Sequence, residues 1–379
     1  MKYLITIIMF YSMLTACKST GKDKQMSMPV VFSDTLAADT SAQSTTGHGG
    51  SADAMADTLT VALTGDIMMG TTYPAVMLPA DSGKRLFLHV ADILRSADLA
   101  VGNLEGTLSD DTVDTSKQKN AHSYSFRTPT RYGARLKEAG YDFLSMANNH
   151  SFDFGIEGVR SSERTLRANG IAYAGIAGRT EVAVVERGGV RYGICAFGHN
   201  HYTVMHMRHD YAKTLLDSLA RISDVVVVSF HGGAEGRSKN RLPYGKETFL
   251  GEDRGSLRDF AHFCIDNGAD IVYGHGPHVV RCVEVYKDRF IAYSLGNFCT
   301  PYGISVAGTS GYAPVVRVNM LPDGTFVSGK VHSFIQRRGV GPCADTLNIV
   351  ASEMKRLTEL DVTGSPVRMD KQGNISRKE

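Results

Sequence analysis

The sequence has 379 residues and a balanced charge, with 41 Lys and Arg against 39 Asp and Glu. Nucleic-acid-binding domains usually carry a basic stripe, and none is visible in this sequence, so we expect no nucleic-acid partner. The six Cys residues include no C-x-x-C pair, which argues against a cysteine-based metal cluster.

The first 16 residues resemble a lipoprotein signal peptide. Lys2 precedes an apolar stretch over residues 4–14, which is too short to span a bilayer comfortably. The tetrapeptide LTAC that ends at Cys17 resembles the bacterial lipobox, in which the cysteine becomes the lipidated first residue of the mature protein. We therefore expect a lipid on Cys17 and an extracytoplasmic protein that is lipid-anchored to a bacterial membrane. The alternative is an ordinary secretory signal peptide followed by a coincidental cysteine.

Residues 17–58 are rich in Ser, Thr and Ala, and the short run Pro-Val-Val-Phe at residues 29–32 is their main apolar interruption. Such a composition cannot bury enough apolar surface to offset the entropy that is lost on ordering. This segment is predicted to be a flexible tether that holds the folded part of the chain away from the lipid surface.

Strand and helix patterns alternate from residue 58 to residue 273. The predicted strands are 58–64, 99–102, 143–146, 225–230 and 271–273, and the predicted helices are 84–96, 130–139, 156–168, 210–222 and 257–266. A hairpin is predicted around residues 187–190. Further strands are predicted at 283–288, 289–296, 313–321 and 326–336, followed by a helix at 345–360 and a polar, frayed end at 362–379.

This order of elements predicts an α/β (α+β) fold in which two packed sheets carry helices on their outer faces. Residues 59–342 are sufficient for one domain with a substantial core. Residues 343–379 would then form a C-terminal helix and a polar tail. Cys195, Cys264 and Cys282 lie within apolar patterns and are predicted core residues, and the sequence assigns no disulfide.

Polar residues follow the predicted strands where the apolar runs end. In open α/β sheets the ligand crevice lies at the carboxyl ends of the strands, so side chains from several strand ends can converge on one site. Carboxylate, amide and imidazole donors together suit a hard or borderline divalent metal. The candidates are Asp66, Glu105, Asn148, Asn149, His150, His231, His275 and His278.

Six ordered motifs in this chain resemble those of the capsule-biosynthesis CapA family. They are Gly65-Asp66, GNLE ending at Glu105, NNH ending at His150 with Asp153 and Gly155, HGGAE from His231 to Glu235, GHGPH at 274–278 and SLGNF at 294–298. That family is associated with poly-γ-glutamate synthesis and is similar to a branch of the calcineurin-like metallophosphoesterases. The resemblance covers about residues 59–333 and implies a four-layer αββα sandwich of two mixed sheets.

The resemblance also implies a role for each matched side chain. The metal ligands would be Asp66, the bridging carboxylate Glu105, Asn149, His231, His275 and His278. The catalytic residues would be His150, which faces the scissile phosphate, and Asn148, whereas the substrate contacts would be Glu235 and Asn297. The implied cofactor is a divalent metal such as Mn, Fe or Zn.

Two positions depart from the pattern of other phosphoesterases. Met68 stands where they place a histidine ligand two residues after the first aspartate, and a thioether is a poor ligand for a hard cation. His278 lies three residues after His275, where those enzymes use two. Because Met68 removes a donor, we expect one tight metal site and a second site that is weak or absent.

Each candidate also has an interpretation without chemistry. An Asp after a strand commonly forms a turn or caps a helix, and paired Asn residues can form a turn. A His after a run of valines can be a half-buried structural residue. Four further histidines have a spacing that matches no closed tetrahedral set, and we expect solvated loop positions for His199, His201, His206 and His209.

Two classes of function remain open from the sequence. In the first, the lipoprotein is a metal-dependent hydrolase that acts on a phosphoester or an amide of a cell-surface polymer, with His150 as proton donor. In the second, it is a non-catalytic accessory lipoprotein that assists polymer export or attachment. The expected partners are an anionic cell-surface polymer or its precursor, a capsule synthase complex, and the membrane through the N-terminal lipid.

Overall fold

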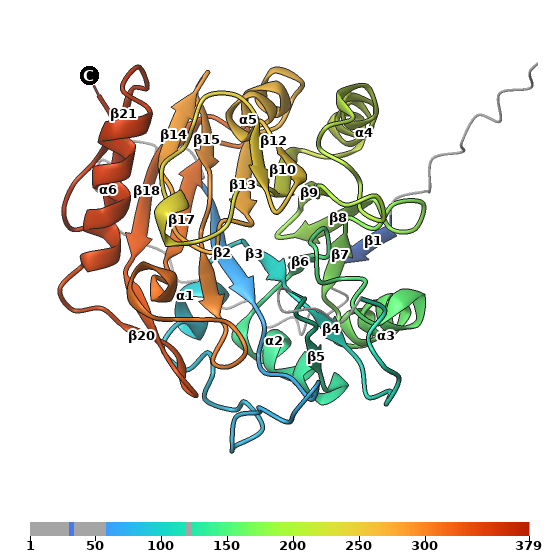
Figure 1. The fold of residues 1–379 in the computed structure, drawn as a ribbon. Helices are drawn as coiled ribbons and strands as arrows, with labels where there is room; N and C mark the ends of the chain where they lie inside the picture. The colour runs from blue at the N-terminus through green and yellow to red at the C-terminus, as the bar shows by residue number, and fades with distance from the viewer. Residues whose placement is uncertain (1–29, 34–57, 118–122, 379) are drawn as a thin grey trace, which may run out of the picture.

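Two β-sheets packed face to face form the core of the computed structural model, which describes residues 30–33, 58–117 and 123–378 (Figure 1). The first sheet has the strand order β1-β8-β9-β10-β13-β15-β14. Its strands span Val30–Ser33 (β1), Val182–Arg187 (β8), Val190–Phe197 (β9), Val225–His231 (β10), Ile271–His275 (β13), Val283–Tyr286 (β14) and Arg289–Ala292 (β15).

The second sheet has the order β21-β22-β18-β17-β2-β3-β6-β7, and β16 also pairs with β2. Its strands span Leu59–Ile67 (β2), Leu99–Leu104 (β3), Phe143–Ser145 (β6), Ala172–Ala174 (β7), Asn297–Cys299 (β16), Val315–Met320 (β17), Phe326–His332 (β18), Val367–Met369 (β21) and Asn374–Arg377 (β22). Short two-stranded pairs join Thr107–Leu108 (β4) to Arg127–Thr128 (β5), Glu247–Phe249 (β11) to Glu252–Gly255 (β12), and Phe334–Arg337 (β19) to Gly341–Ala344 (β20).

Parallel strands lie next to one another in the middle of the first sheet and in one half of the second. The runs β9-β10-β13-β15 and β2-β3-β6-β7 are parallel throughout. Strands of this kind are covered on both faces, so their sequences are nearly continuous apolar runs. The sequence VVVVSFH of β10 fits this description, because all of its residues are buried.

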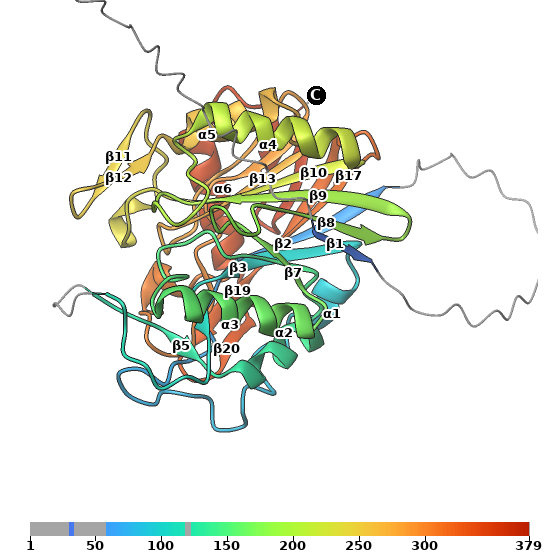
Figure 2. The same ribbon diagram turned by 90° about the vertical axis from the view of Figure 1, so that its right-hand side faces the viewer.

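Helices cover the outer face of each sheet. Helices α1 (Ala91–Arg95), α2 (Gly133–Ala139) and α3 (Gly155–Ala168) share an apolar cluster with the second sheet, whereas α4 (His209–Ile222) and α5 (Leu257–Asp266) contact the first sheet at β9 and β13. Figure 2 shows α4 and α5 on one side of the two sheets and α2 and α3 on the other. The predicted αββα sandwich is confirmed.

Alternation within one strand shows how the two apolar layers are separated. In β2, Val61 and Leu63 belong to the cluster between the sheets, whereas Ala62 belongs to the cluster under the helices. This is the two-residue period of a strand with both faces covered. The predicted helix at 84–96 is shorter than expected, because the segment before Ala91 forms hydrogen-bonded turns instead.

The C-terminal segment differs from the predicted polar tail. Helix α6 (Ile349–Asp361) packs beside β14, where Thr358 Oγ1 accepts a hydrogen bond from the Val283 amide at 3.1 Å. Strands β21 and β22 then extend the second sheet, and they bury Met369 and Ile375 in the main core. The folded domain therefore continues past residue 342 to the end of the described chain.

The N-terminal strand β1 corrects part of the predicted tether. Residues Val30–Ser33 pair in parallel with β8 at the edge of the first sheet, and the Phe32 ring meets the Tyr173 ring edge-on at 6.1 Å. The apolar run Val-Val-Phe supplies this strand, because β-branched and aromatic side chains suit a sheet edge. The signal peptide at residues 1–16, Cys17 and the remainder of the tether lie outside the described residues.

Three 3-10 helices, Thr130–Tyr132 (η1), Arg237–Lys239 (η2) and Gly308–Gly311 (η3), complete the elements. Within the described ranges, none of the helices has the length and apolar content needed to cross a bilayer. The cysteines of the described chain are unpaired. Cys195, Cys264, Cys282 and Cys299 are buried, and Cys343 is partly exposed.

Candidate functional site

Strand ends from both sheets meet at one place. The register of the first sheet sets His231 opposite His275, and the register of the second sets Asp66 opposite Asn103. The two pairs contact each other across the sandwich, since Asp66 Oδ1 lies 3.1 Å from His275 Nδ1. The carboxyl ends of these parallel strands therefore build a shared site, as the topology of such sheets favours.

Asp66 is fully buried at the centre of the site. Its Oδ2 lies 3.0 Å from His278 Nδ1, and its Oδ1 accepts a hydrogen bond from Asn103 Nδ2 at 2.9 Å. Burial alone would raise the pKa of Asp66, but the nearby rings of His275 and His278 outweigh it and lower that pKa well below its usual range. Asp66 is therefore a carboxylate at neutral pH.

His278 is the positive partner of Asp66. Burial alone would lower its pKa, but the hydrogen bond and the charge of Asp66 outweigh burial and raise the pKa to about 10. Asn297 holds the same ring, because its Oδ1 lies 3.0 Å from His278 Nδ1 and its Nδ2 donates to the His278 carbonyl oxygen. Asn297 is fully buried by these contacts, so it orients His278 and does not line the cleft as the predicted substrate contact would.

Glu105 is the second buried carboxylate. Asn103 Nδ2 donates to its Oε2 at 2.6 Å, and His231 Nε2 lies 3.3 Å from the same oxygen. Its Oε1 has no hydrogen-bond partner within the described chain. Burial, followed by the nearby charge of Asp66, raises the pKa of Glu105 to about 7. A positive charge beside Glu105 would favour its ionised form and so lower its pKa again.

Asn148 organises the loop after β6. Its Nδ2 donates to Asn103 Oδ1 at 2.9 Å and to the Leu104 carbonyl at 2.7 Å, and its Oδ1 accepts from the His150 amide at 3.0 Å. All of its polar atoms are used inside the protein, so the structure gives Asn148 a positioning role rather than the predicted catalytic one. Sequence reasoning missed Asn103, which links Asp66, Glu105 and Asn148. Its place in the motif GNLE was the available signal.

His150 and Asn149 face the cleft. His150 Nδ1 lies 3.0 Å from Asp153 Oδ2, and Lys117 Nζ lies 2.5 Å from Asp153 Oδ1. A carboxylate in this position fixes an imidazole ring and leaves Nε2 as the reactive nitrogen. That Nε2 lies 4.0 Å from Glu105 Oε1. Asn149 Oδ1 is buried but has no hydrogen-bond partner in the described residues.

The ring nitrogens of His231 and His275 have no hydrogen-bond partners within the described residues. Both rings are fully buried, and neither ring nitrogen of either residue satisfies hydrogen-bond geometry with the described chain. Burial lowers the pKa of His231 well below its usual value, so the ring is neutral. Buried polar atoms without partners are costly unless another group completes them. Neutral imidazole is also the form that binds metals.

The donor chemistry fits a divalent cation. Glu105, Asn149, His231 and His275 carry unpartnered oxygen and nitrogen atoms, which is the mixture that Mn, Fe or Zn accept. His275 lies 3.1 Å from the Asp66 carboxylate, and His231 lies 3.3 Å from the Glu105 carboxylate. Within residues 30–33, 58–117 and 123–378, no group of three or more His, Cys, Asp or Glu side chains already stands in metal-binding geometry. The fit therefore rests on open donor atoms and not on a preformed coordination shell.

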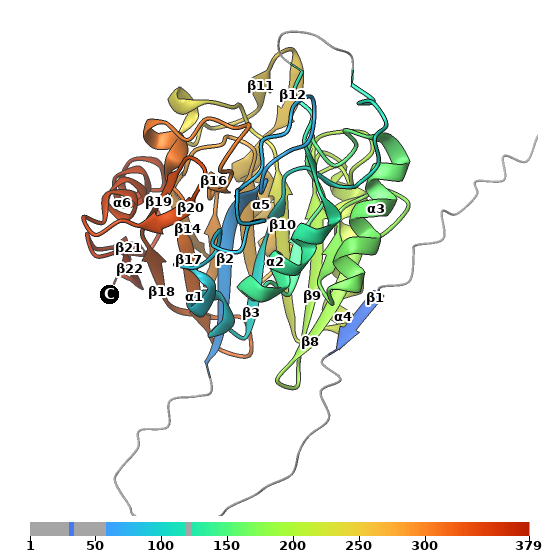
Figure 3. The same cartoon turned by 90° about the horizontal axis from the view of Figure 1, so that it is seen from below.

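A cleft of about 720 Å³ has Lys117, Asn149, His150, Glu235 and Arg254 in its walls. It borders the donor set through Asn149 and through His150, whose Nε2 lies 4.0 Å from Glu105 Oε1. Residues of the β11–β12 hairpin, among them Phe249 and Arg254, line the cleft, and Figure 3 shows this hairpin at one end of the molecule. Arg254 Nη1 donates to Glu235 Oε1 at 2.7 Å. Burial would raise the Glu235 pKa, but His278 and Arg254 outweigh it and lower that pKa. Glu235 thus occupies the cleft wall, where the predicted substrate contact would be.

Two of the four loop histidines are not solvated as predicted. His199 is buried with its Nδ1 3.5 Å from the His231 carbonyl oxygen, and His206 is buried against Phe260 at a ring distance of 5.5 Å. Burial lowers the pKa of His199 to about 2 and that of His206 to about 3. The loop folds back over β10, which its composition did not indicate. His201 and His209 are exposed as predicted.

Met68 is part of an apolar wall. The side chain is buried, and a Cβ built on Gly303 would lie 2.8 Å from Met68 Cε and 3.1 Å from the Phe126 ring. Met68 and Phe126 therefore contact the same glycine. The sequence position two residues after Asp66 is therefore filled by an apolar side chain beside an aromatic ring.

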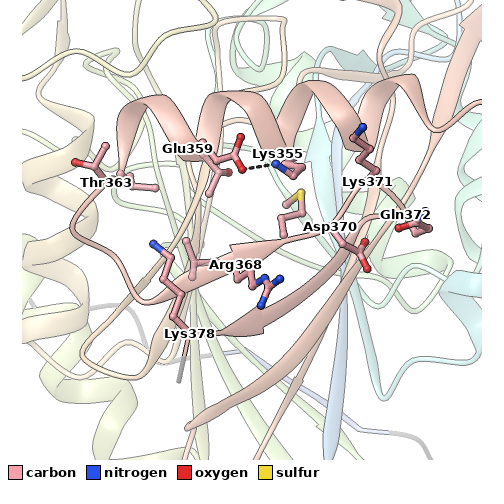
Figure 4. Close-up of a pocket in the computed structure, with 12 residues that line it drawn as sticks. Lys355, Glu359, Thr363, Arg368, Asp370, Lys371, Gln372 and Lys378 are labelled. Atoms are coloured by element: carbon pink, nitrogen blue, oxygen red, sulfur yellow. Dashed lines mark hydrogen bonds and ion pairs between the residues drawn. The ribbon is translucent and has the colours of Figure 1, made fainter.

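A second cavity, of about 620 Å³, lies between α6 and the β21–β22 hairpin (Figure 4). Lys355, Arg368, Lys371 and Lys378 are among its lining residues, and Figure 4 shows Lys355 paired with Glu359. None of the strand-end residues described above lines this cavity. The unpartnered buried donors identify the cleft beside His150, and not this groove, as the candidate site.

Comparison with known proteins gives concordant sequence matches. The family model described as bacterial capsule synthesis protein PGA_cap matches residues 60–302. The PGA biosynthesis protein CapA of Bacillus subtilis is 26% identical over 262 residues, which cover 65% of this chain and 64% of that protein, so the match spans less than two thirds of the relative's length. The capsule biosynthesis protein CapA of Bacillus anthracis is 28% identical over 314 residues, which cover 76% and 71%.

Among solved structures, a 5'-nucleotidase precursor from Thermus thermophilus matches with a TM-score of 0.44 and 14% sequence identity. The aligned part covers 75% of this chain and 56% of that protein.

Proposed function

This chain belongs to the bacterial capsule synthesis family PGA_cap, and from that membership we propose that it is a lipid-anchored, metal-dependent hydrolase of capsule or poly-γ-glutamate synthesis. The substrate class that suits the site is a phosphoester of a cell-surface polymer or of its precursor. Two relatives named for capsule or PGA biosynthesis support the pathway.

The observation that carries the proposal is the set of buried donor atoms without partners. Glu105 Oε1, Asn149 Oδ1 and the ring nitrogens of His231 and His275 all lack hydrogen-bond partners in the described chain, although burial makes such atoms costly. With Asp66 and His278, these residues would hold a divalent cation. A purely structural core would have filled these positions with apolar or paired groups.

Side chains of the protein would donate the proton and bind the phosphoryl group. When bound, a divalent metal polarises a phosphoryl oxygen and activates water at neutral pH. His150 Nε2 faces Glu105 and is placed to donate a proton to a leaving oxygen, while Asp153 keeps the ring oriented through Nδ1. Lys117 lines the cleft beside His150 and adds positive charge near a bound phosphoryl group. Met68 supplies no hard donor, so we expect one tight site.

The test combines metal analysis with turnover of an aryl phosphodiester in added Mn²⁺. Protein purified without chelator should contain Mn, Fe or Zn, and Glu105→Gln should lower metal affinity by at least about tenfold, because the charge that faces the cation is lost. Glu252→Gln is the matched control, since this carboxylate lines the cleft with a 53% exposed side chain and pairs with Arg254. A metal-free protein that retains full turnover would refute the proposal.

A non-catalytic accessory role is the second candidate, and the Asp66–His278 pair favours it. An aspartate already matched by a protonated histidine at 3.0 Å has less need of a cation. In this case the protein would bind an anionic polymer or its synthase. Saturable binding of polyglutamate without any turnover of phosphodiesters would support this role over hydrolysis.

The proposed location is tested separately at Cys17. Incorporation of an acyl label should be lost in Cys17→Ala and kept in Cys343→Ala, because only Cys17 follows a lipobox-like sequence. A Cys17→Ala protein that is still labelled would contradict the anchor.

A further inference from the structure

We propose that the cleft has an apolar annex that binds the aliphatic chain of an amphiphilic phosphoester. The annex is a cavity of about 370 Å³ with walls that include Tyr73, Pro74, Met77, Tyr124, Phe126 and Gly303. Its volume lies in the range of small-molecule pockets. The cleft beside His150 would take the charged end of the same ligand.

The annex and the cleft are contiguous. Ser123 and Tyr124 line both cavities. Phe126 forms a wall of the annex, and its ring packs against the His150 ring with centroids 4.5 Å apart. A group in the annex is therefore separated from the catalytic imidazole by one aromatic side chain. Such a group could belong to the same molecule as a phosphoryl group beside His150.

The hydroxyls of four residues in the annex wall, Thr71, Tyr73, Thr115 and Ser125, are already paired inside the protein. Thr71 Oγ1 accepts hydrogen bonds from the Tyr73 and Arg127 amides at 3.1 and 3.0 Å. The Tyr73 hydroxyl donates to Asp114, and the hydroxyls of Thr115 and Ser125 pair with each other at 2.5 Å. These groups have little hydrogen-bonding capacity left for a ligand.

No lining residue of the annex carries a charge, whereas the cleft contains Lys117, His150, Glu235 and Arg254. The two cavities therefore differ sharply in polarity. A polyglutamate chain carries a carboxylate on every residue and would lose solvation in the annex without a counter-charge. An aliphatic chain gains free energy there, because apolar surface leaves water.

Met68 extends this apolar environment toward the metal donors. Its Cε and the Phe126 ring lie on the same side of Gly303, which is itself a lining residue of the annex. Met68 thus adds a buried apolar side chain next to Gly303 in the annex wall.

The test measures binding and does not depend on turnover. Calorimetry on the full chain compares octyl phosphate with ethyl phosphate, both below micelle formation. Each methylene that leaves water adds about fourfold in affinity, so we expect octyl phosphate to bind at least about tenfold tighter. The inference rests on the proposed function only in placing the phosphoryl group beside Asn149 and His150. Failure of hydrolysis would therefore leave this preference measurable.

Three variants locate the preference in the annex. Met77→Asp places a charge in the annex wall and should abolish the advantage of octyl phosphate, whereas Met77→Leu should keep it. Val76→Asp is the matched control, because Val76 is 72% exposed and does not line the annex. Thermal unfolding checks that each variant is folded.

Three results would overturn the inference. They are equal affinity of the wild type for the two phosphates, no binding of either phosphate, and a loss of the preference in Val76→Asp as large as that in Met77→Asp.

Discussion

The two buried carboxylates at the centre of the site have pKa values that are shifted in opposite directions. Asp66 is held ionised by His275 and His278, whereas burial and the charge of Asp66 raise the pKa of Glu105 to about 7. Pairs of acidic groups with divergent pKa values are typical of functional sites. Among the described histidines, His150 is the one that lines the cleft, and Asp153 fixes its ring.

The role of His150 can be separated from metal binding. His150→Asn should slow hydrolysis of an alkyl phosphodiester by about 10²–10⁴-fold, because an alkoxide leaves poorly without a proton. A p-nitrophenyl ester should be slowed much less, since its leaving group needs no proton. The ratio of kcat values for the two substrates is the measurement. His201→Asn, which changes an exposed histidine, is the control. Equal losses on both substrates would exclude proton donation.

The identity of residue 68 should set the metal stoichiometry. Met68→His restores an imidazole two residues after Asp66 and should raise the amount of Mn or Zn bound per chain, as measured by elemental analysis after dialysis. Met68→Leu keeps the apolar wall and should leave the metal content unchanged. If the two variants hold equal metal, residue 68 does not face the ion.

The residue types at strand ends predicted which side chains form the site, but the sequence did not predict their hydrogen-bond partners. The positions of Asp66, Glu105, His231 and His275 could be inferred because an apolar run ends at each of them. The motif GNLE drew attention to Asn103, but its role could not be inferred locally, because it depends on Asp66 and Asn148, which other segments bring to it. Burial of His199 was equally hidden, because it depends on how a loop folds over a distant strand.

At the scale of elements, the β11–β12 hairpin forms one wall of the cleft, and a buried ion pair holds it there. Arg281, which is fully buried, donates to Glu247 Oε1 and Oε2 at 2.8 and 2.7 Å. Glu247 Oε2 also accepts from the Ala234 amide at 3.0 Å. The pair thus joins the hairpin to the loop after β10, which carries Glu235.

Breaking this pair should be costly. Glu247→Leu leaves the Arg281 guanidinium buried without its partner and should reduce the free energy of unfolding by about 3–5 kcal/mol, as measured by urea denaturation. The double variant Glu247→Leu, Arg281→Met should recover most of that loss, since both charges are gone. A double variant as unstable as the single one would show that the pair itself is not the cause.

The elements that the sequence predicted well are the long central ones. Strand β10 and helix α4 have strong local periodicity, which is enough to define them. Strands β1, β21 and β22 have three or four residues each, and each becomes a strand only by pairing with a distant segment. Local patterns do not contain that information.

At the scale of the whole molecule, three histidines have lowered pKa values: His199 and His206 are buried, and His332 is partly buried. Burial, followed by the charges of Arg317 and Lys330, lowers the pKa of His332 to about 4, and burial lowers those of His199 and His206 further. In the unfolded chain these groups titrate near 6.5. Between pH 6.5 and 4 these three histidines bind more protons in the unfolded state than in the folded state, so their contribution to stability falls as the pH decreases. Glu105, with its raised pKa, acts in the opposite direction but is a single group against three.

Urea midpoints at pH 7.5, 6 and 5 test this dependence. The midpoint should decrease with pH in the wild type, and the decrease should be smaller in His332→Gln, which removes one of the groups. His89→Gln is the control, because residue 89 is an exposed histidine. A midpoint that rises on acidification would contradict the assignment.

Strand β1 would limit how far the folded domain can move from a lipid attached at Cys17. An extended chain reaches at most about 3.3–3.6 Å per residue. A tether that ran from an acylated Cys17 to residue 58 would therefore allow roughly 140 Å between the lipid and the folded domain. Because Val30 already pairs with β8 at the edge of the sheet, the greatest distance between Cys17 and the folded domain falls to roughly 45 Å. The cleft would then stay close to the bilayer surface, where amphiphilic molecules expose their headgroups.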